Sequence, residues 1–364
     1  MSDFGKYFLP GPTEVRPEVI EAMVRPVIGH RSREMEALMD RVAPRLRWLF
    51  RTERPVYVST SSATGLMEAA IRNCAPRSVL SLVCGAFSER FYQIAVACGR
   101  DADRVSVELG ESNEPDAVRD ALERREYDAV TTVHSETSTG VLNPVEAIAR
   151  TVQDVAPEAL VLVDCVTSLA SARVETDAWG LDFALAGSQK GIAVPPGLAF
   201  GVASQRAYDR SLATPGRGLY FSFEAFESAA TARQTSNTPA VSLLYALDAQ
   251  LARIELEGLE ARWARHETMA ERTWQWVAEM RERHDIELGV LATEGRRSPS
   301  VTCITLPEDL SGVDVARSMK ARGFTIASGY AKLKERTIRI GHMGDHTVQE
   351  LEALLEELGQ VIVG

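Results

Sequence analysis

Short apolar runs alternate with longer amphipathic stretches through the first two-thirds of the chain. The apolar runs have the length and composition of buried strands, and the amphipathic stretches have helical spacing. This alternation predicts an α/β protein built on a mostly parallel seven-stranded sheet with helices on both faces. The expected strands are Val56–Ser59, Ser78–Val83, Arg104–Leu109, Ala129–Val133, Leu160–Val163, Phe183–Ala186 and Leu198–Ala203, and the helices between them are Gly65–Cys74, Phe87–Cys98, Pro115–Arg125 and Val145–Val155.

The last pair of strands departs from this rhythm. About ten residues separate Phe183–Ala186 from Leu198–Ala203, and so short a link cannot carry a helix across the sheet. We therefore expect Leu198–Ala203 to run antiparallel to the strand before it.

The final third of the chain has a different pattern. A long helical region over Val241–Glu257 resumes after Gly258 and continues to Arg283. At 364 residues the chain exceeds what one hydrophobic core usually serves, so two domains are expected. We predict an N-terminal arm at residues 1–15, a large domain at 16–240, and a connecting helix with a smaller C-terminal α+β domain at 241–364. The small domain should hold strands Val301–Leu306, Phe324–Ala327 and Thr337–Ile340 and helices Val313–Arg322 and Val348–Val361.

Composition narrows the class of protein. The chain is 45% hydrophobic and 25% charged, as in soluble globular proteins, and its net charge of −11 argues against nucleic-acid binding. No apolar run approaches the length that crosses a bilayer, so we expect no membrane association. The five cysteines form no C-x-x-C pair, which favours free thiols over disulfides or a metal site and indicates a cytoplasmic protein.

The candidate chemistry lies just after the strands. Lys190 follows the expected strand Phe183–Ala186 within the segment GSQKGIAVPPG. Burial lowers the affinity of a lysine for its proton, and the neutral amine attacks carbonyl carbon. A lone lysine in such a turn is usually an ordinary loop residue, so the argument depends on what lies nearby. Ligands bind at the carboxyl ends of parallel strands, so the residues at the other strand ends indicate whether Lys190 belongs to a ligand site.

Four further strand ends carry polar or aromatic residues. Thr60–Gly65 opens a helix and could hold a phosphate on backbone N–H groups, although for this stretch alone a plain helix cap is the more common explanation. Phe87, at the next helix start, could stack on a flat ligand or simply fill the core. Asp164 ends an apolar strand and needs a partner, because an unpaired buried carboxylate is costly. The run HSETSTGVLNP follows the strand Ala129–Val133.

Together these residues make one constellation. Pyridoxal phosphate requires a lysine for the Schiff base, a carboxylate for the pyridinium nitrogen and a helix N-terminus for the phosphate. The spacing of Asp164 and Lys190 leaves room for one crossover, which places both at the same edge of neighbouring or near-neighbouring strands. The sequence therefore predicts a pyridoxal-phosphate site.

At these residues the chain resembles the class V, fold-type-I pyridoxal-phosphate aminotransferases, in the alanine–glyoxylate and serine–pyruvate branch. The resemblance runs over nearly the whole length and includes LPGPTEV, GHRS, HSETSTGVLNP, VLVDCVTSL, GSQKGIAVPPG and RIGHMG. It implies that Lys190 bonds to the cofactor, that Asp164 holds the pyridinium nitrogen, and that Arg339 binds the substrate carboxylate. The other cofactor contacts that it implies are Ser62, Ala63, Thr64, Phe87, Thr137, Val166 and Gln189 and, reaching into a second subunit of a homodimer, Gln234 and Thr235.

The implied activity is transfer of an amino group from alanine or serine to glyoxylate or pyruvate by a ping-pong mechanism. Two departures stand out: Ser61–Thr64 lacks the glycines that the family often has there, and Phe87 replaces a usual tryptophan. A 2-aminoethylphosphonate transaminase, for which Arg31, Arg33 and Arg217 are available cations, stays an alternative. So do a lyase or desulfurase and a non-catalytic binder on the same scaffold, although Cys303, expected within a strand, argues against a desulfurase.

Overall fold

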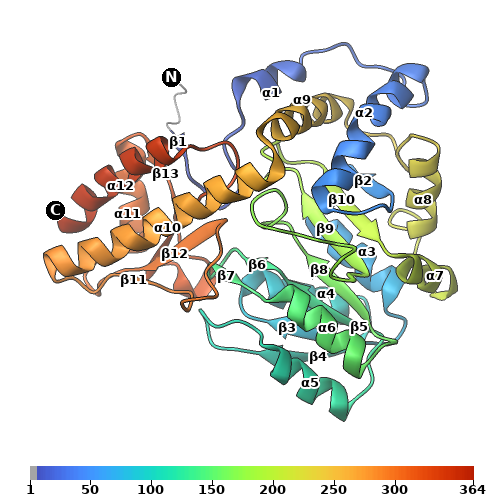
Figure 1. Ribbon diagram of the computed structural model, residues 1–364, viewed down its shortest axis with the longest axis horizontal. Helices are drawn as coiled ribbons and strands as arrows, with labels where there is room; N and C mark the ends of the chain where they lie inside the picture. The colour runs from blue at the N-terminus through green and yellow to red at the C-terminus, as the bar shows by residue number, and fades with distance from the viewer. Residues whose placement is uncertain (1–5) are drawn as a thin grey trace.

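The core of the computed structural model, which describes residues 6–364, is a seven-stranded sheet (Figure 1). Its strand order is β2-β10-β9-β8-β5-β3-β4. Neighbouring strands are parallel except at β10, which pairs antiparallel with both β2 and β9. The strands are β2 (Val56–Ser59), β3 (Ser78–Val83), β4 (Asp101–Ser106), β5 (Ala129–Val133), β8 (Leu160–Asp164), β9 (Phe183–Gly187) and β10 (Ala199–Ala203). The predicted fold class and the antiparallel last strand are both confirmed.

Two hydrophobic clusters cover the two faces of this sheet. Side chains alternate along each strand, so that Val161 and Val163 of β8 belong to one cluster while Leu160 and Leu162 belong to the other. The first face is covered by α2 (Arg33–Phe50), α5 (Pro115–Arg124), α6 (Val145–Val155) and α9 (Val241–Glu257), and the second by α3 (Ala63–Cys74), α4 (Ala86–Ala97), α7 (Gln205–Ala213) and α8 (Phe223–Thr231).

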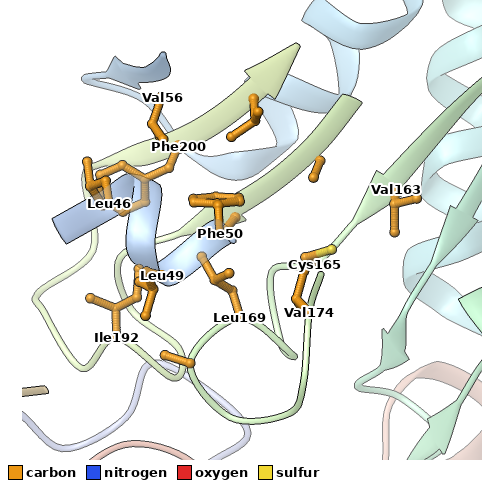
Figure 2. Packing of buried hydrophobic residues seen from close by; sticks show 14 of the residues in the cluster. Leu46, Leu49, Phe50, Val56, Val163, Cys165, Leu169, Val174, Ile192 and Phe200 are labelled. Atoms are coloured by element: carbon orange, nitrogen blue, oxygen red, sulfur yellow. The ribbon is translucent and has the colours of Figure 1, made fainter. Parts of the chain in front are cut away.

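The first cluster also anchors the loop that follows β9. Ile192, in this loop, is buried in the same cluster as Leu49 of α2 and Leu169 (Figure 2). This packing anchors the backbone just after Lys190 in the hydrophobic core. The polar side chains lie at the carboxyl edge of the sheet.

A second, smaller sheet lies beyond the long helix α10 (Leu259–His284), which continues from α9 (Figure 1). Its order is β11-β12-β15-β14, and every pair is antiparallel. A third hydrophobic cluster joins this sheet to α10 and to two helices that follow in the chain. The elements are β11 (Gly289–Val290), β12 (Val301–Thr305), β14 (Ala327–Ser328), β15 (Thr337–Gly341), α11 (Gly312–Ala321) and α12 (Val348–Val363). The domain limits expected at residues 15 and 240 stay predictions.

The N-terminal segment ties the two sheets together. Residues 1–5 of the expected arm lie outside the described residues, and Lys6–Tyr7 form β1, which pairs with β13 (Phe324–Thr325). The chain then passes through Leu9–Thr13 to α1 (Pro17–Ala22) on the large-sheet side.

Some elements differ from the sequence expectation. The strand expected at Arg104–Leu109 lies at Asp101–Ser106, because an edge strand tolerates polar residues that face solvent. The strand expected at Phe324–Ala327 divides into β13 and β14, which pair with different partners. The elements that were not anticipated include α7, α8 and a hairpin of β6 (Ser135–Glu136) and β7 (Val141–Leu142).

All five cysteines are free, as expected, and only Cys98 is not buried. Within residues 6–364, no helix combines the length and the apolar character that a membrane crossing needs. No cluster of three or more residues suited to bind a metal occurs in that range either.

Candidate active site

Lys190 lies in the turn after β9, at the carboxyl edge of the large sheet. Its side chain is only 8% exposed, and its Nζ donates a hydrogen bond to the carbonyl of Pro10 in the N-terminal arm. Gly11 packs directly on the lysine: a Cβ there would lie 2.5 Å from Nζ, and the φ of +106° also favours glycine. Burial lowers the pKa of Lys190 to about 8, so a substantial fraction of the amine is neutral near physiological pH.

Asp164 ends β8, the strand beside β9, and is 3% exposed. Its Oδ1 accepts a hydrogen bond of 2.7 Å from the backbone N–H of Val166, and it forms no ion pair with any described residue. Burial raises the pKa of Asp164 to about 7, with a smaller contribution from the nearby Glu136, while Lys190 opposes the shift. A bound group that carries a proton on nitrogen would stabilise this carboxylate.

Phe87 lies in the first turn of α4, with its ring on the side of the lysine. Lys190 Nζ is 5.9 Å from the centre of the ring, and the ring is only partly buried. The backbone N–H of Phe87 donates to the carboxylate of Glu136. The ring is therefore available to stack on a flat ligand that is attached to Lys190.

The N-terminus of α3 lies close to the end of β9. The helix begins at Ala63, and its N-cap Ser62 makes no side-chain hydrogen bond to the helix. The N–H of Gly65 donates to the Ser62 carbonyl, whereas those of Ala63 and Thr64 donate to no residue that the structure describes. A Cβ on Gly187 would lie 2.8 Å from Gln189 Oε1 and 3.5 Å from Ala63 Cβ, which places these three residues around one point. Ser62 and Thr64 are exposed. Free N–H groups and hydroxyls at a helix N-terminus suit a phosphate.

Arg339, on β15 of the small sheet, reaches the same region from the other side. It is 8% exposed, and it donates to the carbonyls of Ser328 and Thr137, each at 3.2 Å. The Thr137 hydroxyl lies 2.6 Å from the hydroxyl of Thr167. No acidic residue in the described part of the chain forms an ion pair with Arg339. Burial lowers the pKa of its guanidinium. A buried cation without an ion-pair partner is suited to bind an anionic ligand.

Gln234 and Thr235 lie elsewhere. They follow α8 and line a cavity of about 320 Å³ together with residues of α2 and β2, including Met39 and Val56. None of the residues around Lys190 lines that cavity. The printed contacts thus link Lys190 with Phe87, Asp164 with Val166 and Arg339 with Thr137, and they place Gln189 beside Ala63 at the start of α3, whereas Gln234 and Thr235 line a separate cavity.

Two residues near the site were missed by sequence reasoning. Tyr330 places its ring 5.5 Å from that of Phe87 and 5.6 Å from the guanidinium carbon of Arg339. Nothing in its local sequence marks it. Glu136 is completely buried beside Phe87, and its signal was its position in the polar run HSETSTG.

The residues present fit pyridoxal phosphate. A desolvated amine, an aromatic ring at 5.9 Å, an unpaired buried carboxylate on the next strand and an open helix N-terminus are what that cofactor requires. Fold and site together define a pyridoxal-phosphate-dependent enzyme of fold type I.

The comparisons with known proteins identify the family. The model for the class-V aminotransferases matches residues 10–354. An uncharacterized aminotransferase of Methanocaldococcus jannaschii is 37% identical, over 96% of this chain and 92% of that protein. A serine–glyoxylate aminotransferase of Methylorubrum extorquens is 32% identical, over 93% and 86%. The crystal structure of a Thermus thermophilus aspartate aminotransferase of subgroup IV, 34% identical, matches 98% of this chain and 99% of that chain with a TM-score of 0.88. The chain belongs to the class-V aminotransferase family.

Proposed function

We propose that the protein transfers an amino group from a small amino acid, alanine or serine, to a small 2-oxo acid, glyoxylate or pyruvate. The observation that carries the proposal is that two residues occur in one site: Lys190, a desolvated amine, and Arg339, a buried cation without an acidic ion-pair partner among residues 6–364. Both substrates of such a reaction carry a carboxylate next to the reacting carbon, and one guanidinium can bind either in turn.

Each side chain has a distinct task in this proposal. Pyridoxal phosphate, when bound, supplies an electron-accepting ring that makes the substrate Cα–H bond acidic. Arg339 binds the substrate carboxylate through two parallel N–H···O bonds. Lys190 would hold the cofactor and, as a free neutral amine, its Nζ would take the proton from the substrate Cα. The Asp164 carboxylate would hold the ring nitrogen and keep it protonated.

The cofactor contacts follow the same placement. We propose that the phosphate lies on the N-terminus of α3, against Ser62, Ala63 and Thr64, with Gln189 beside it. Phe87 and Val166 would hold the ring between them. Thr137, whose carbonyl accepts a hydrogen bond from Arg339, would contact the phenolic side of the ring.

The names of the relatives support the oxo-acid acceptor. The Methylorubrum extorquens relative is a serine–glyoxylate enzyme, whereas the Thermus thermophilus relative is named for aspartate. Aspartate therefore belongs in the donor panel beside alanine and serine.

The alternative reactions are less well supported. A desulfurase needs a mobile cysteine near the site, and Cys303 is buried inside β12 with a pKa raised to about 11 by burial. A phosphonate substrate needs further cations, and Arg217, one of the candidates, pairs with Glu224.

We also propose a homodimer in which Gln234 and Thr235 complete the phosphate site of the partner. They line a cavity to which none of the residues around Lys190 contributes, and this placement is compatible with a role in the site of a partner chain. Large apolar side chains are exposed at Val24, Val27 and Leu219, which supports burial against a second copy. The five free cysteines are compatible with a reducing, cytoplasmic location.

A single-turnover experiment tests the proposed reaction. The purified protein, loaded with pyridoxal phosphate, is mixed with alanine, serine, aspartate, cysteine or 2-aminoethylphosphonate without any oxo acid. We expect the absorbance band of the lysine-bound cofactor to disappear with alanine or serine and to return when glyoxylate or pyruvate is added. The proposal is wrong if only another donor reacts, or if a Lys190→Ala protein turns over the donor at the wild-type rate.

A further inference from the structure

Glu136 is a fully buried carboxylate at the edge of the candidate site. It lies in β6, and its side chain accepts hydrogen bonds from five donors on two segments. From α4 it receives the N–H of Phe87 (3.2 Å) and the N–H and hydroxyl of Ser88 (2.9 Å each). From its own hairpin it receives the N–H and hydroxyl of Ser138 (3.1 and 2.6 Å).

Glu136 forms no ion pair with any residue that the structure describes, although Lys190 and Arg339 are near enough to interact with it electrostatically. The N-terminal N–H groups of α4 stabilise the carboxylate directly, because a carboxylate at a helix N-terminus faces the positive end of the helix dipole. The backbone is shaped to admit it: a Cβ on Gly85 would lie 2.5 Å from Glu136 Cγ and 2.5 Å from Ser138 Oγ. The carboxylate therefore fixes the first turn of α4, which carries Phe87.

The hairpin that holds Glu136 also contacts the small-sheet side of the molecule. The carbonyl of Thr137 accepts a hydrogen bond from Arg339, and the hydroxyl of Ser135 lies 2.7 Å from that of Ser298. The backbone continues the connection, because Ser298 N–H donates to Gly140 (2.8 Å) and Leu142 N–H donates to Arg296 (2.7 Å). One short hairpin thus contacts both the helix that carries the aromatic ring and the arginine expected to bind substrate.

We propose that Glu136 is a positioning residue that fixes Phe87 against the cofactor ring and, through the hairpin, sets the carbonyl on which Arg339 rests. The proposal depends on the cofactor and carboxylate sites described under the proposed function. Its cofactor part is independent of which amino acid donates the amino group.

The first test is Glu136→Gln. The amide keeps one acceptor oxygen but turns an NH₂ group toward N–H donors, which breaks part of the network while keeping the volume. We expect the apoenzyme to bind pyridoxal phosphate about tenfold more weakly, measured by quenching of tryptophan fluorescence, and the KM for the amino donor to rise about tenfold. The matched control is Glu89→Gln, the same change at a surface residue of α4 that forms an ion pair with Arg104. It should leave both the affinity for pyridoxal phosphate and the KM for the amino donor unchanged.

A double-mutant cycle separates positioning from general support of the fold. If Glu136 acts through the aromatic ring, Glu136→Gln in a Phe87→Ala background should weaken cofactor binding less than twofold further. Equal weakening in both backgrounds would overturn the proposal, and so would unchanged cofactor affinity in the single variant.

Two milder variants keep the test usable if Glu136→Gln does not fold. Ser138→Ala and Ser88→Ala each remove one hydroxyl donor and leave the carboxylate in place, so each should weaken cofactor binding by two- to fivefold. Wild-type affinity in both would contradict the proposal. If the wild-type protein turned over none of the small donors, the proposed function would fail while the cofactor-binding result would still decide the role of Glu136.

Discussion

Two arginines are almost completely buried among residues 6–364, and their surroundings are opposite. Arg262, on α10, is 1% exposed and donates to the carboxylates of Glu257 (2.7 Å) and Asp345 (2.9 Å). It also donates to the carbonyl of Gly191 (2.8 Å), the residue after Lys190. Arg339 is 8% exposed, and within the described part of the chain it donates only to two backbone carbonyls.

The contrast separates support from function. Burying a charge is costly unless it is paired, and Arg262 is paired by acidic residues of its own chain. Through its hydrogen bond to Gly191, it stabilises the loop that carries Lys190. Arg339 has no ion-pair partner among residues 6–364, so its charge is available for an anionic ligand. The aspartates repeat the pattern: Asp182 pairs with Arg206 at 2.9 Å and accepts from Ser204, whereas Asp164 has only the N–H of Val166.

The comparison predicts first that removing Arg262 strongly lowers the free energy of unfolding. Arg262→Leu leaves two carboxylates without their buried partner and should cost about 3–5 kcal/mol of unfolding free energy. Urea denaturation of the apoenzyme measures this loss. The control is Arg253→Leu, which removes a more exposed cation 3.9 Å from Asp345 and should cost less than about 1 kcal/mol. Wild-type stability in Arg262→Leu would break the comparison.

The opposite outcome is expected for Arg339. Arg339→Leu removes a buried charge that has no partner in the chain, so the unfolding free energy should stay the same or rise. The KM for the amino donor should rise about 100-fold, since two hydrogen bonds to a charged carboxylate are lost. Arg336→Leu, at an exposed arginine near the start of the same strand, should change neither value. An Arg339→Leu protein that unfolds easily but binds the donor normally would reverse the assignment.

The aspartates give a smaller effect with a defined sign. The pKa of Asp164 rises to about 7 in the folded apoenzyme from an ordinary 3.8, so the folded state loses stability as the pH increases from about 4 to about 7. Asp164→Asn cannot ionise and escapes this loss. At pH 7.5 the apo variant should therefore exceed wild type by about 1–3 kcal/mol, an advantage that shrinks by pH 5.

Thermal melts at pH 5 and pH 7.5 measure this difference. Asp182→Asn, which loses the ion pair with Arg206, should instead be less stable than wild type at pH 7.5. Two variants with changes of the same sign would remove the distinction between the two aspartates.

The smallest effect concerns two phenylalanines of α4. Phe87 is partly buried and faces the site, whereas Phe91, one turn later, is 1% exposed in the core. Phe87→Trp adds ring area where the cofactor should stack, so apoenzyme affinity for pyridoxal phosphate should increase two- to fivefold (about 0.5–1 kcal/mol). Phe91→Trp overfills the core and should lower stability by about 1–3 kcal/mol. Titration and melting of both proteins check this; weaker cofactor binding by Phe87→Trp would mean that its ring does not stack on the cofactor.

The sequence alone determined the sheet and the place of its chemistry. Apolar runs report burial on both faces, and the rule that ligands bind at strand carboxyl ends placed Asp164 and Lys190 together. The short link before Ala199–Ala203 determined the antiparallel strand. These are local or topological properties, and one chain carries enough information to infer them.

Only the tertiary structure decided how the charges near the site are paired. Pro10 and Gly11 lie on Lys190 across a long stretch of chain, and Tyr330 reaches Phe87 and Arg339 from the small-sheet side. The sequence shows Arg262 and Arg339 as two similar cations, because pairing depends on which distant segments pack together. Packing gave one arginine an ion pair with Asp345 and gave the other no ion-pair partner among residues 6–364, and that difference distinguishes support from the proposed substrate site.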